Sequence, residues 1–461
     1  MEKIESPEEK RIFRKLWSQE KSFYLETGCV NNCCHILGEK IDAQMLTEAV
    51  NYQIEKNPML GMTVEQCLDG EYYWVELANK QINLVQEFII EDDKLLQEKQ
   101  TEIINLRLDY SKVLLTVNLL QTQGKSIVML GYPHCFADGV SGMILINGLL
   151  NIYNLIRQQK HDEIKKIEVI QPIPHAQDLA FPNGLNPQQE SRIQEILINT
   201  QKVRNSWKPS LPFVHSERQL RNIPQFRDSS KECFLKLVQK CRSEQITIGS
   251  VLVSCLYFGL SKMLGEYKID LKFDIDVNLR DRFINKLGFK NIGMLVGVIQ
   301  LNISMDENTQ FWEFARQIHK QIKQSLLNED QFSYLTVNSL FNWDSDEYKQ
   351  NLKQNGGLTS NFNFSNIGKY PFNPIYQAEG LQDIKLEKMY CAGNDWVPYF
   401  GAYLILINCV ESFNFTLIVN DQEDNKKTGQ TLFDYFTNLV EVSPDLGESF
   451  SLKNYHSQRF I

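Results

Sequence analysis

The sequence predicts an α/β fold made of two lobes, and three observations support this. The chain has 461 residues, and at roughly 100–200 residues per domain two domains are the natural expectation. Short apolar runs typical of strands mix with helical periodicity in both halves. Prolines cluster between residues 160 and 221, where that pattern weakens. We therefore expect a first lobe over residues 1–175, a linker over 176–225 and a second lobe over 226–461.

The first lobe begins with an apolar segment over residues 23–37, which reads as a strand with irregular ends. An amphipathic helix is expected from near Asp42, because Asp42 suits an N-cap and apolar residues recur every four positions after it. Pro58 ends that helix, since proline cannot continue the backbone hydrogen-bond ladder and disfavours helical conformation in the residue before it.

Three further elements follow the proline. Two apolar runs, over residues 113–120 and 126–132, flank a polar turn and predict a hairpin or a pair of neighbouring strands. Residues 139–156 carry apolar side chains around most of a helical circumference, which indicates a buried helix. The proline-rich connection contains one helical pattern, over residues 188–203.

The second lobe mixes helical and strand patterns in the same way. We expect helices over residues 231–241, 248–264, 311–327 and 429–442, and strands over residues 269–277, 297–304, 400–410 and 413–419. Only Glu411 and Ser412 separate the last two strands, which indicates an antiparallel pair.

The composition excludes several classes of protein. A formal net charge of −9 would repel a polyanionic phosphate backbone, so nucleic acid is not an expected ligand. The ten cysteines form no Cys-x-x-Cys motif, which is typical of buried thiols in a reducing compartment. The first residues lack the apolar stretch of a signal peptide, and no apolar run reaches the about 18 residues of a membrane span. We therefore expect a cytoplasmic protein without a transmembrane segment, and an organellar location stays open.

The candidate general base is His134, in the segment Pro-His-Cys-Phe-Ala-Asp-Gly over residues 133–139. His134 ends an apolar strand and precedes a buried helix, and such a turn presents a side chain from rigid elements on both sides. The unperturbed pKa of histidine is about 6.5, so near neutral pH its neutral form accepts a proton from a hydroxyl or an amine. The other histidines show no metal-ligand spacing, and no metal site is predicted.

Asp138 and Gly139 complete a His-x-x-x-Asp-Gly pattern. At i+4 Asp138 could orient His134, but a carboxylate at a helix entrance more often caps N–H groups or pairs with a cation, and we favour that structural role. Gly139 would let the backbone turn without a Cβ clash. The pattern alone also arises by chance, and the alternative interpretation is a histidine at a strand end followed by a helix-capping aspartate.

The order of the motifs resembles the superfamily of coenzyme-A-dependent acyltransferases that includes chloramphenicol acetyltransferase, wax ester synthases, alcohol acetyltransferases and peptide-synthetase condensation domains. The matching segments are LTEAV at 46–50 with NPML at 57–60, the His134 motif, ITIGSVL at 246–252, DVNLR at 276–280 and SNFNFSNIG at 360–368. The resemblance spans nearly the whole chain. It implies two lobes, each a mixed sheet flanked by helices, with a tunnel between them.

The resemblance also implies roles for individual residues. His134 would be the base, and Asp138 would be held by an arginine, for which Arg280 is the expected residue and Arg282 its rival. Such an ion pair is physically sensible, because a buried carboxylate without a partner is strongly destabilising. Many relatives have two consecutive histidines, and Pro133 replaces the first of them in this sequence.

Ser365 and Asn366 lie where the family brings a crossover segment towards its tunnel. The resemblance implies that they hydrogen-bond the oxyanion or position substrate. A polar turn between strands is the alternative interpretation for this pair.

The expected function is acyl transfer without a covalent enzyme intermediate, from a thioester to an alcohol or an amine. Acyl-CoA is the expected co-substrate, a carrier-protein thioester stays open as the donor, and no covalently bound cofactor is expected. The main alternative is a catalytically inactive protein of the same fold that serves as a structural or binding subunit of a larger assembly. A serine hydrolase is disfavoured because no Gly-x-Ser-x-Gly elbow occurs.

Overall fold

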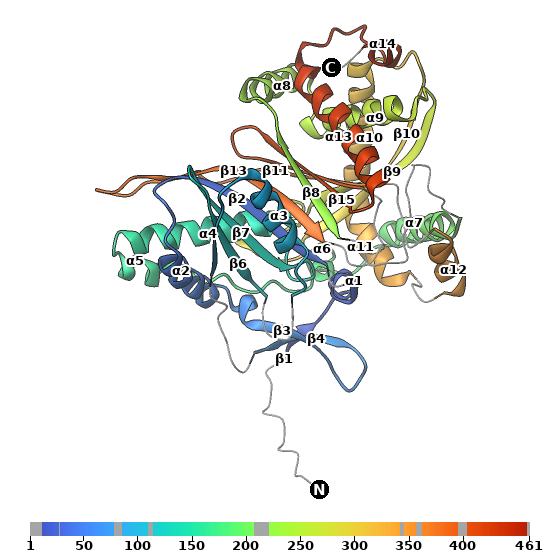
Figure 1. Ribbon diagram of the computed structural model, residues 1–461. Coiled ribbons are helices and arrows are strands. Elements are labelled where there is room, and N and C mark those ends of the chain that lie inside the picture. The colour runs from blue at the N-terminus through green and yellow to red at the C-terminus, as the bar shows by residue number, and fades with distance from the viewer. Residues whose placement is uncertain are drawn as a thin grey trace. The chain divides into compact units, whose positions relative to one another are not determined.

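The computed structural model consists of two compact units (Figure 1). Unit 1 comprises Met1–Pro182, Arg280–Leu295 and Pro371–Glu387, and unit 2 comprises Asn183–Leu279, Val296–Tyr370 and Lys388–Ile461. The structure describes residues 12–26, 28–77, 85–108, 114–206, 221–341, 345–355, 362–394 and 403–458.

Unit 1 is built on a six-stranded mixed sheet with the strand order β12-β13-β2-β7-β6-β5. Its strands are β2 (Cys29–Gly38), β5 (Gln86–Ile89), β6 (Thr116–Gln121), β7 (Ser126–Pro133), β12 (Ile375–Tyr376) and β13 (Ile384–Asn394), of which residues 388–394 belong to unit 2. β6 and β7 form the predicted hairpin, with Gln121 opposite Ser126. β5 runs parallel to β6, whereas β7 is antiparallel to both of its neighbours. A smaller antiparallel sheet contains β1 (Ile12–Lys15), β4 (Tyr72–Glu76) and β3 (Met62–Gln66).

Helices cover both faces of the larger sheet. The helices of unit 1 are α1 (Ser18–Glu26), α2 (Ala43–Lys56), η1 (Pro58–Gly61), α3 (Asp93–Ile104), α4 (Gly139–Arg157), α5 (His161–Lys166), α6 (Ala176–Ala180) and η2 (Gly288–Lys290). Gln100 on α3 donates to the sulfur of Cys33 at 3.2 Å, while a Cβ added to Gly142 on α4 would lie 2.0 Å from the amide nitrogen of Asn32. Because Asn32 and Cys33 are consecutive strand residues and point to opposite faces, α3 and α4 cover opposite faces of the sheet.

Two predicted helices of unit 1 are confirmed. The side chain of Asp42 accepts a hydrogen bond from the Met45 N–H and starts α2, and Pro58 follows its last turn. α4 has the predicted apolar circumference. It is long and apolar enough to cross a membrane by those criteria alone, but 72% of its most apolar window is buried inside the protein, as in the core helix of a globular unit.

The predicted strand start at residue 23 is wrong, because residues 23–26 belong to α1 and β2 begins at Cys29. The cause is a tertiary contact around the buried Glu20. Its carboxylate accepts hydrogen bonds from the Trp17 N–H and from the indole of Trp74, and it pairs with Arg14 at 2.8 Å. These contacts hold the start of a helix whose residues carry little helical periodicity.

Unit 2 contains a four-stranded sheet with the order β11-β14-β15-β8 and a two-stranded sheet of β10 and β9. The strands are β8 (Asn222–Asp228), β9 (Ile269–Asn278), β10 (Val296–Met305), β11 (Phe362–Lys369), β14 (Tyr403–Cys409) and β15 (Phe413–Asn420). The predicted antiparallel pair is confirmed as β14 and β15, although residues 400–402 lie outside the described residues. β11 adds to this pair in parallel orientation.

The helices of unit 2 are α7 (Pro187–Ser206), α8 (Lys231–Glu244), α9 (Ile248–Leu264), α10 (Phe311–Leu327), α11 (Asp330–Leu340), α12 (Asp346–Gln354), α13 (Glu423–Val442), η3 (Ser443–Asp445) and α14 (Leu452–Ser457). α8, α9, α10, α13 and α14 enclose the main core of this unit, whereas α7 and α11 meet in a smaller apolar cluster. The core joins α8, α9, α10 and α13 to alternate residues of β14 and β15, such as Ile405 and Phe415. The four helices predicted for the second lobe are confirmed, but α13 begins at Glu423 rather than at residue 429.

The division of the chain differs from a simple order of lobe, linker and lobe. Residues 280–295 and 371–387 pack with unit 1, although both lie beyond the predicted linker. The physical reason for the first of these segments is an ion pair in the interior of unit 1, which involves Arg280. Hydrophobic periodicity carries no information on such long-range returns of the chain.

Candidate active site

A tight turn between β7 and α4 carries the sequence His134 to Asp138. The N–H of His134 donates to the carbonyl oxygen of Gly28 at 2.8 Å, which continues the strand pairing by one residue. The chain then turns, the N–H of Phe136 donates to the carbonyl oxygen of Pro133 at 3.0 Å, and α4 begins at Gly139. His134 is thus held between a buried strand and a buried helix.

The imidazole of His134 lies in an apolar setting. It stacks on the ring of Phe23 from α1, with ring centroids 4.1 Å apart and an angle of 29° between the planes. The side chain keeps part of its surface exposed, but its Nδ1 atom is buried and has no hydrogen-bond partner in the described part of the chain.

The pKa of His134 lies below its ordinary value of 6.5. Burial is the largest cause, because removal of water penalises the charged imidazolium. Three other influences raise the pKa, but together they are weaker than burial. They are the backbone groups of His134 and Ala137 and the carboxylate of Asp138. The imidazole of His134 is consequently neutral at neutral pH.

Asp138 has the structural role that the sequence favoured. Its side chain caps α4, accepting from the Ser141 N–H at 2.7 Å. Arg280 makes a two-pronged ion pair with it, with Nη1 to Oδ2 at 2.8 Å and Nη2 to Oδ1 at 3.0 Å. The N–H of Leu295 donates to Oδ2 at 3.0 Å as well. Asp138 and Arg280 are both fully buried, so the pair is shielded from water.

The pKa of Asp138 is lower than its ordinary value of 3.8. Burial alone would raise it and is the largest single influence, but the charge and hydrogen bonds of Arg280, helped by Ser141, outweigh burial. Asp138 is therefore ionised at neutral pH, and Arg280 pairs with its negative charge. Arg282, the rival for this pairing, is exposed.

Ser141 completes this network, and the sequence analysis did not identify it. Its hydroxyl accepts from Arg280 Nη2 at 2.7 Å and from the Gly293 N–H at 3.0 Å, and it donates to the Gly293 carbonyl at 3.0 Å. An Asp-x-x-Ser spacing at a helix start was the available signal, because it places Ser141 one turn above the capping carboxylate.

Replacing Ser141 by alanine is expected to lower the free energy of unfolding by about 1–3 kcal/mol, because it leaves the Gly293 N–H and one Arg280 nitrogen short of a buried partner. Urea unfolding measures the change. Ser254→Ala is the matched control, since this buried helical serine only donates to the carbonyl of Ser250, and we expect it to cost less than about 1 kcal/mol. Equal costs for both variants would contradict the network.

The predicted conformational role of Gly139 finds no support. Gly139 is the first residue of α4, and it is absent from the described glycines whose φ lies in the left-handed region. Gly142 is the glycine that this turn requires, because a Cβ there would lie 2.3 Å from the hydroxyl of Tyr132. That hydroxyl donates to the Asp138 carbonyl at 3.0 Å and accepts from Asn32 at 2.9 Å.

Ser365 and Asn366 lie on β11 in unit 2, whereas His134, Asp138 and Arg280 belong to unit 1. Both residues are inside a strand, so the alternative of a polar turn is wrong for them; Ser360 and Asn361 of the same motif lie outside the described residues. The Ser365 hydroxyl hydrogen-bonds Asp276 on β9. Although Asp276 keeps an exposed surface, burial by the surrounding protein raises its pKa to about 6, and Ser365 acts against that shift.

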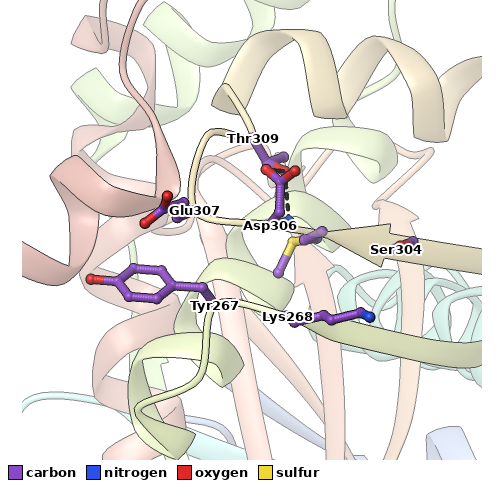
Figure 2. Close-up of a pocket in the computed structure, with 7 residues that line it drawn as sticks. Tyr267, Lys268, Ser304, Asp306, Glu307 and Thr309 are labelled. Carbon is purple, nitrogen blue, oxygen red and sulfur yellow. Dashed lines mark hydrogen bonds between the residues drawn. The ribbon is translucent and has the colours of Figure 1, made fainter.

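A surface hollow of about 420 Å³ lies elsewhere in unit 2, and Figure 2 shows residues that line it. It is bordered by Tyr267 and Lys268, before β9, and by residues from Ser304 to Thr309. None of the predicted site residues lines it. Among the described residues, no group of three or more His, Cys, Asp or Glu side chains is placed to hold a metal ion.

Comparisons with known proteins identify a matching family. The profile of a family described as alcohol acetyltransferase matches residues 11–384. The phthiocerol/phthiodiolone dimycocerosyl transferase of Mycobacterium tuberculosis is 30% identical over 144 residues, which are 31% of this chain and 33% of that protein. The match therefore spans about a third of the length of this curated relative.

Solved structures share the fold. The trichothecene 15-O-acetyltransferase of Fusarium sporotrichioides is similar with a TM-score of 0.71 and 14% identity, over 93% of this chain and 94% of that one. The first condensation domain of the calcium-dependent antibiotic synthetase is similar with a TM-score of 0.65 and 12% identity, over 95% and 98% of the two chains. The predicted α/β class, with mixed sheets flanked by helices in a two-lobed fold, is confirmed.

Proposed function

Because the chain belongs to the alcohol acetyltransferase family, we propose that it transfers an acyl group from a thioester to an alcohol or an amine, with His134 as the general base. The family supports acyl-CoA as the donor, and a carrier-protein thioester is the alternative. The observation that carries the proposal is the neutral, partly exposed imidazole at the end of β7, whose pKa is lowered by burial.

In the proposed reaction, Nε2 of His134 accepts the proton of the acceptor hydroxyl or amine as its oxygen or nitrogen attacks the thioester carbonyl. The tetrahedral oxyanion collapses, the carbon–sulfur bond breaks, and the thiolate leaves with the proton that His134 returns. No bond to the protein forms. Ser365, Asn366 or His134 itself would donate a hydrogen bond to the oxyanion.

Asp138 and Arg280 act indirectly in this scheme. They hold the first turn of α4, and the charge of Arg280 offsets that of the Asp138 carboxylate. A positioning role follows for them, because the relevant geometry is the direction of His134 rather than contact with substrate.

The test uses the purified full chain with acetyl-CoA and a panel of primary alcohols and amines. Release of the free thiol gives the rate, and mass spectrometry identifies the ester or amide formed. We expect thiol release that depends on the acceptor and matches product formation. Thiol release equal with and without acceptor would contradict acyl transfer. No turnover with either coenzyme A or carrier-protein thioesters would instead favour a protein without catalytic activity that serves a structural role.

A further inference from the structure

One face of the short helix α1 lies along the turn that carries His134. Glu20, Phe23 and Tyr24 are spaced at i, i+3 and i+4 and therefore share this face. Phe23 stacks on the imidazole of His134, with ring centroids 4.1 Å apart. Burial and then the charge of Glu20 raise the pKa of the next residue, Cys135, and burial and then Cys135 raise the pKa of Tyr24. Cys135 thus lies near both residues that flank Phe23 on the helix face.

Other parts of unit 1 support α1 without any contribution from the imidazole. Glu20 is 2% exposed, and its carboxylate accepts hydrogen bonds from Arg14 of β1 at 2.8 Å and from the indole of Trp74 of β4 at 3.2 Å. The ring of Tyr24 packs against that of Tyr72, also of β4, with centroids 5.4 Å apart. The aromatic ring that stacks on the imidazole therefore projects from a helix that is fixed to the small sheet.

The imidazole of His134 lacks the hydrogen bond that commonly orients a histidine base. Such a base is usually held through its second ring nitrogen by a carboxylate or a carbonyl group. No side chain in the described part of the chain hydrogen-bonds the buried Nδ1 of His134. The carboxylate of Asp138 binds Arg280 and caps α4 instead. Stacking on Phe23 is a contact that can take over the orienting task.

The geometry of the stack suits that task. Rotation of a histidine ring about its last side-chain bond is only weakly restricted by the side chain itself, so a neighbour has to restrict it. The planes of the two rings lie at 29° to each other, and a turned imidazole would strike the face of Phe23. An aromatic face also attracts the imidazolium that forms when His134 accepts a proton. A flat ring at this position therefore offers more than apolar cover.

We propose that Phe23 is a positioning residue for acyl transfer, whose ring holds the imidazole of His134 in the plane that directs Nε2 at the acceptor proton. The inference rests on the proposed function, in which His134 is the base. Misplacing a reacting group by about 1 Å can lower a rate about a hundredfold. Because Phe23 acts on the imidazole and does not bind substrate, its loss changes kcat rather than KM.

The kinetic test compares Phe23→Leu and Phe23→Tyr with the wild type in the thiol-release assay. Leucine keeps the apolar cover without the flat ring, and we expect kcat to fall about tenfold to a hundredfold with little change in KM. Tyrosine keeps the flat ring at this partly buried position, and kcat should stay close to the wild-type value. Leu25→Ala is the control for disturbance of α1, because Leu25 is 55% exposed on the same helix, and it should keep wild-type kcat.

The His134 ring itself gives two readouts that need no turnover. With 13C-labelled histidine, relaxation should show a rigid ring in the wild type and in Phe23→Tyr, and a mobile ring in folded Phe23→Leu. The pKa of His134 should stay low in Phe23→Leu and rise toward 6.5 in Phe23→Ala, because burial is the largest cause that lowers it and only alanine uncovers the ring.

Three results would overturn the inference: wild-type kcat in folded Phe23→Leu, a rise in KM in place of the loss in kcat, or a ring that is equally rigid in all three proteins. A pKa that rises as much in Phe23→Leu as in Phe23→Ala would also overturn it, because Phe23 would then act through cover alone. If the wild type acylates no acceptor, the proposed function fails, and relaxation still decides on the orienting contact: a ring that loosens only in Phe23→Leu supports it, and equal rigidity overturns it.

Discussion

Replacing Arg280 by methionine is expected to lower the free energy of unfolding by about 3–5 kcal/mol. The substitution removes the only cation that pairs with Asp138 in the described structure, and it leaves a carboxylate with 0% exposure in the interior of unit 1. Chemical denaturation of the full chain measures the loss. Arg282→Met is the control, since the exposed Arg282 should change stability by less than about 0.5 kcal/mol.

The stability of the Arg280→Met variant should change with pH in the direction opposite to that of the wild type. In the wild type the pKa of Asp138 is depressed below 3.8, so its stabilising contribution is present above pH 3.8 and is lost as the pH falls through the lower, folded-state value. Without Arg280, burial would raise that pKa above 3.8, and the variant should gain stability as the pH falls below neutral. Stability within 1 kcal/mol of wild type, or an unchanged pH dependence, would contradict the ion pair as the anchor of α4.

Replacing His134 by alanine is expected to lower kcat for acyl transfer by about 10²–10⁴-fold, the range typical of a positioned general base. KM should change little, because the imidazole acts on the acceptor proton in the transition state rather than on the bound ground state. The assay is thiol release with a saturating acceptor, at equal concentrations of folded protein.

His161→Ala controls for the loss of an imidazole as such, because His161 is exposed at the start of α5. It should retain wild-type kcat. An alanine variant of His134 that keeps more than about a tenth of wild-type kcat, while folded, would remove His134 from the proposed role.

Local sequence rules predicted the elements whose boundaries depend on local chemistry. Asp42, Pro58 and Thr247 set helix ends through caps and a missing N–H, and these ends occur at the expected positions. Elements that depend on distant partners were missed. β11 pairs in parallel with β14, about forty residues later, and β13 joins the sheet of unit 1 from the second half of the chain. No periodicity of a single segment encodes such pairings.

In the candidate site, too, contacts between distant residues were harder to predict from the sequence than the residues themselves. Histidine chemistry and the resemblance to acyltransferases led to His134, Asp138 and Arg280, and the structure brings Asp138 and Arg280 into contact. The stacking of Phe23 on His134 was not predictable, because Phe23 read as a strand residue and lies on α1.

The most direct test of the account is the protonation state of His134 in the full-length protein. With 13C-labelled histidine, the resonance of the seven histidines that is missing from the His134→Ala spectrum belongs to this ring. We expect a neutral imidazole at pH 7, with a pKa below 6.5, and an acyl-transfer rate that falls in step with its protonation. A ring that is still charged at pH 7, or a rate that stays constant while the ring gains its proton, would contradict the account.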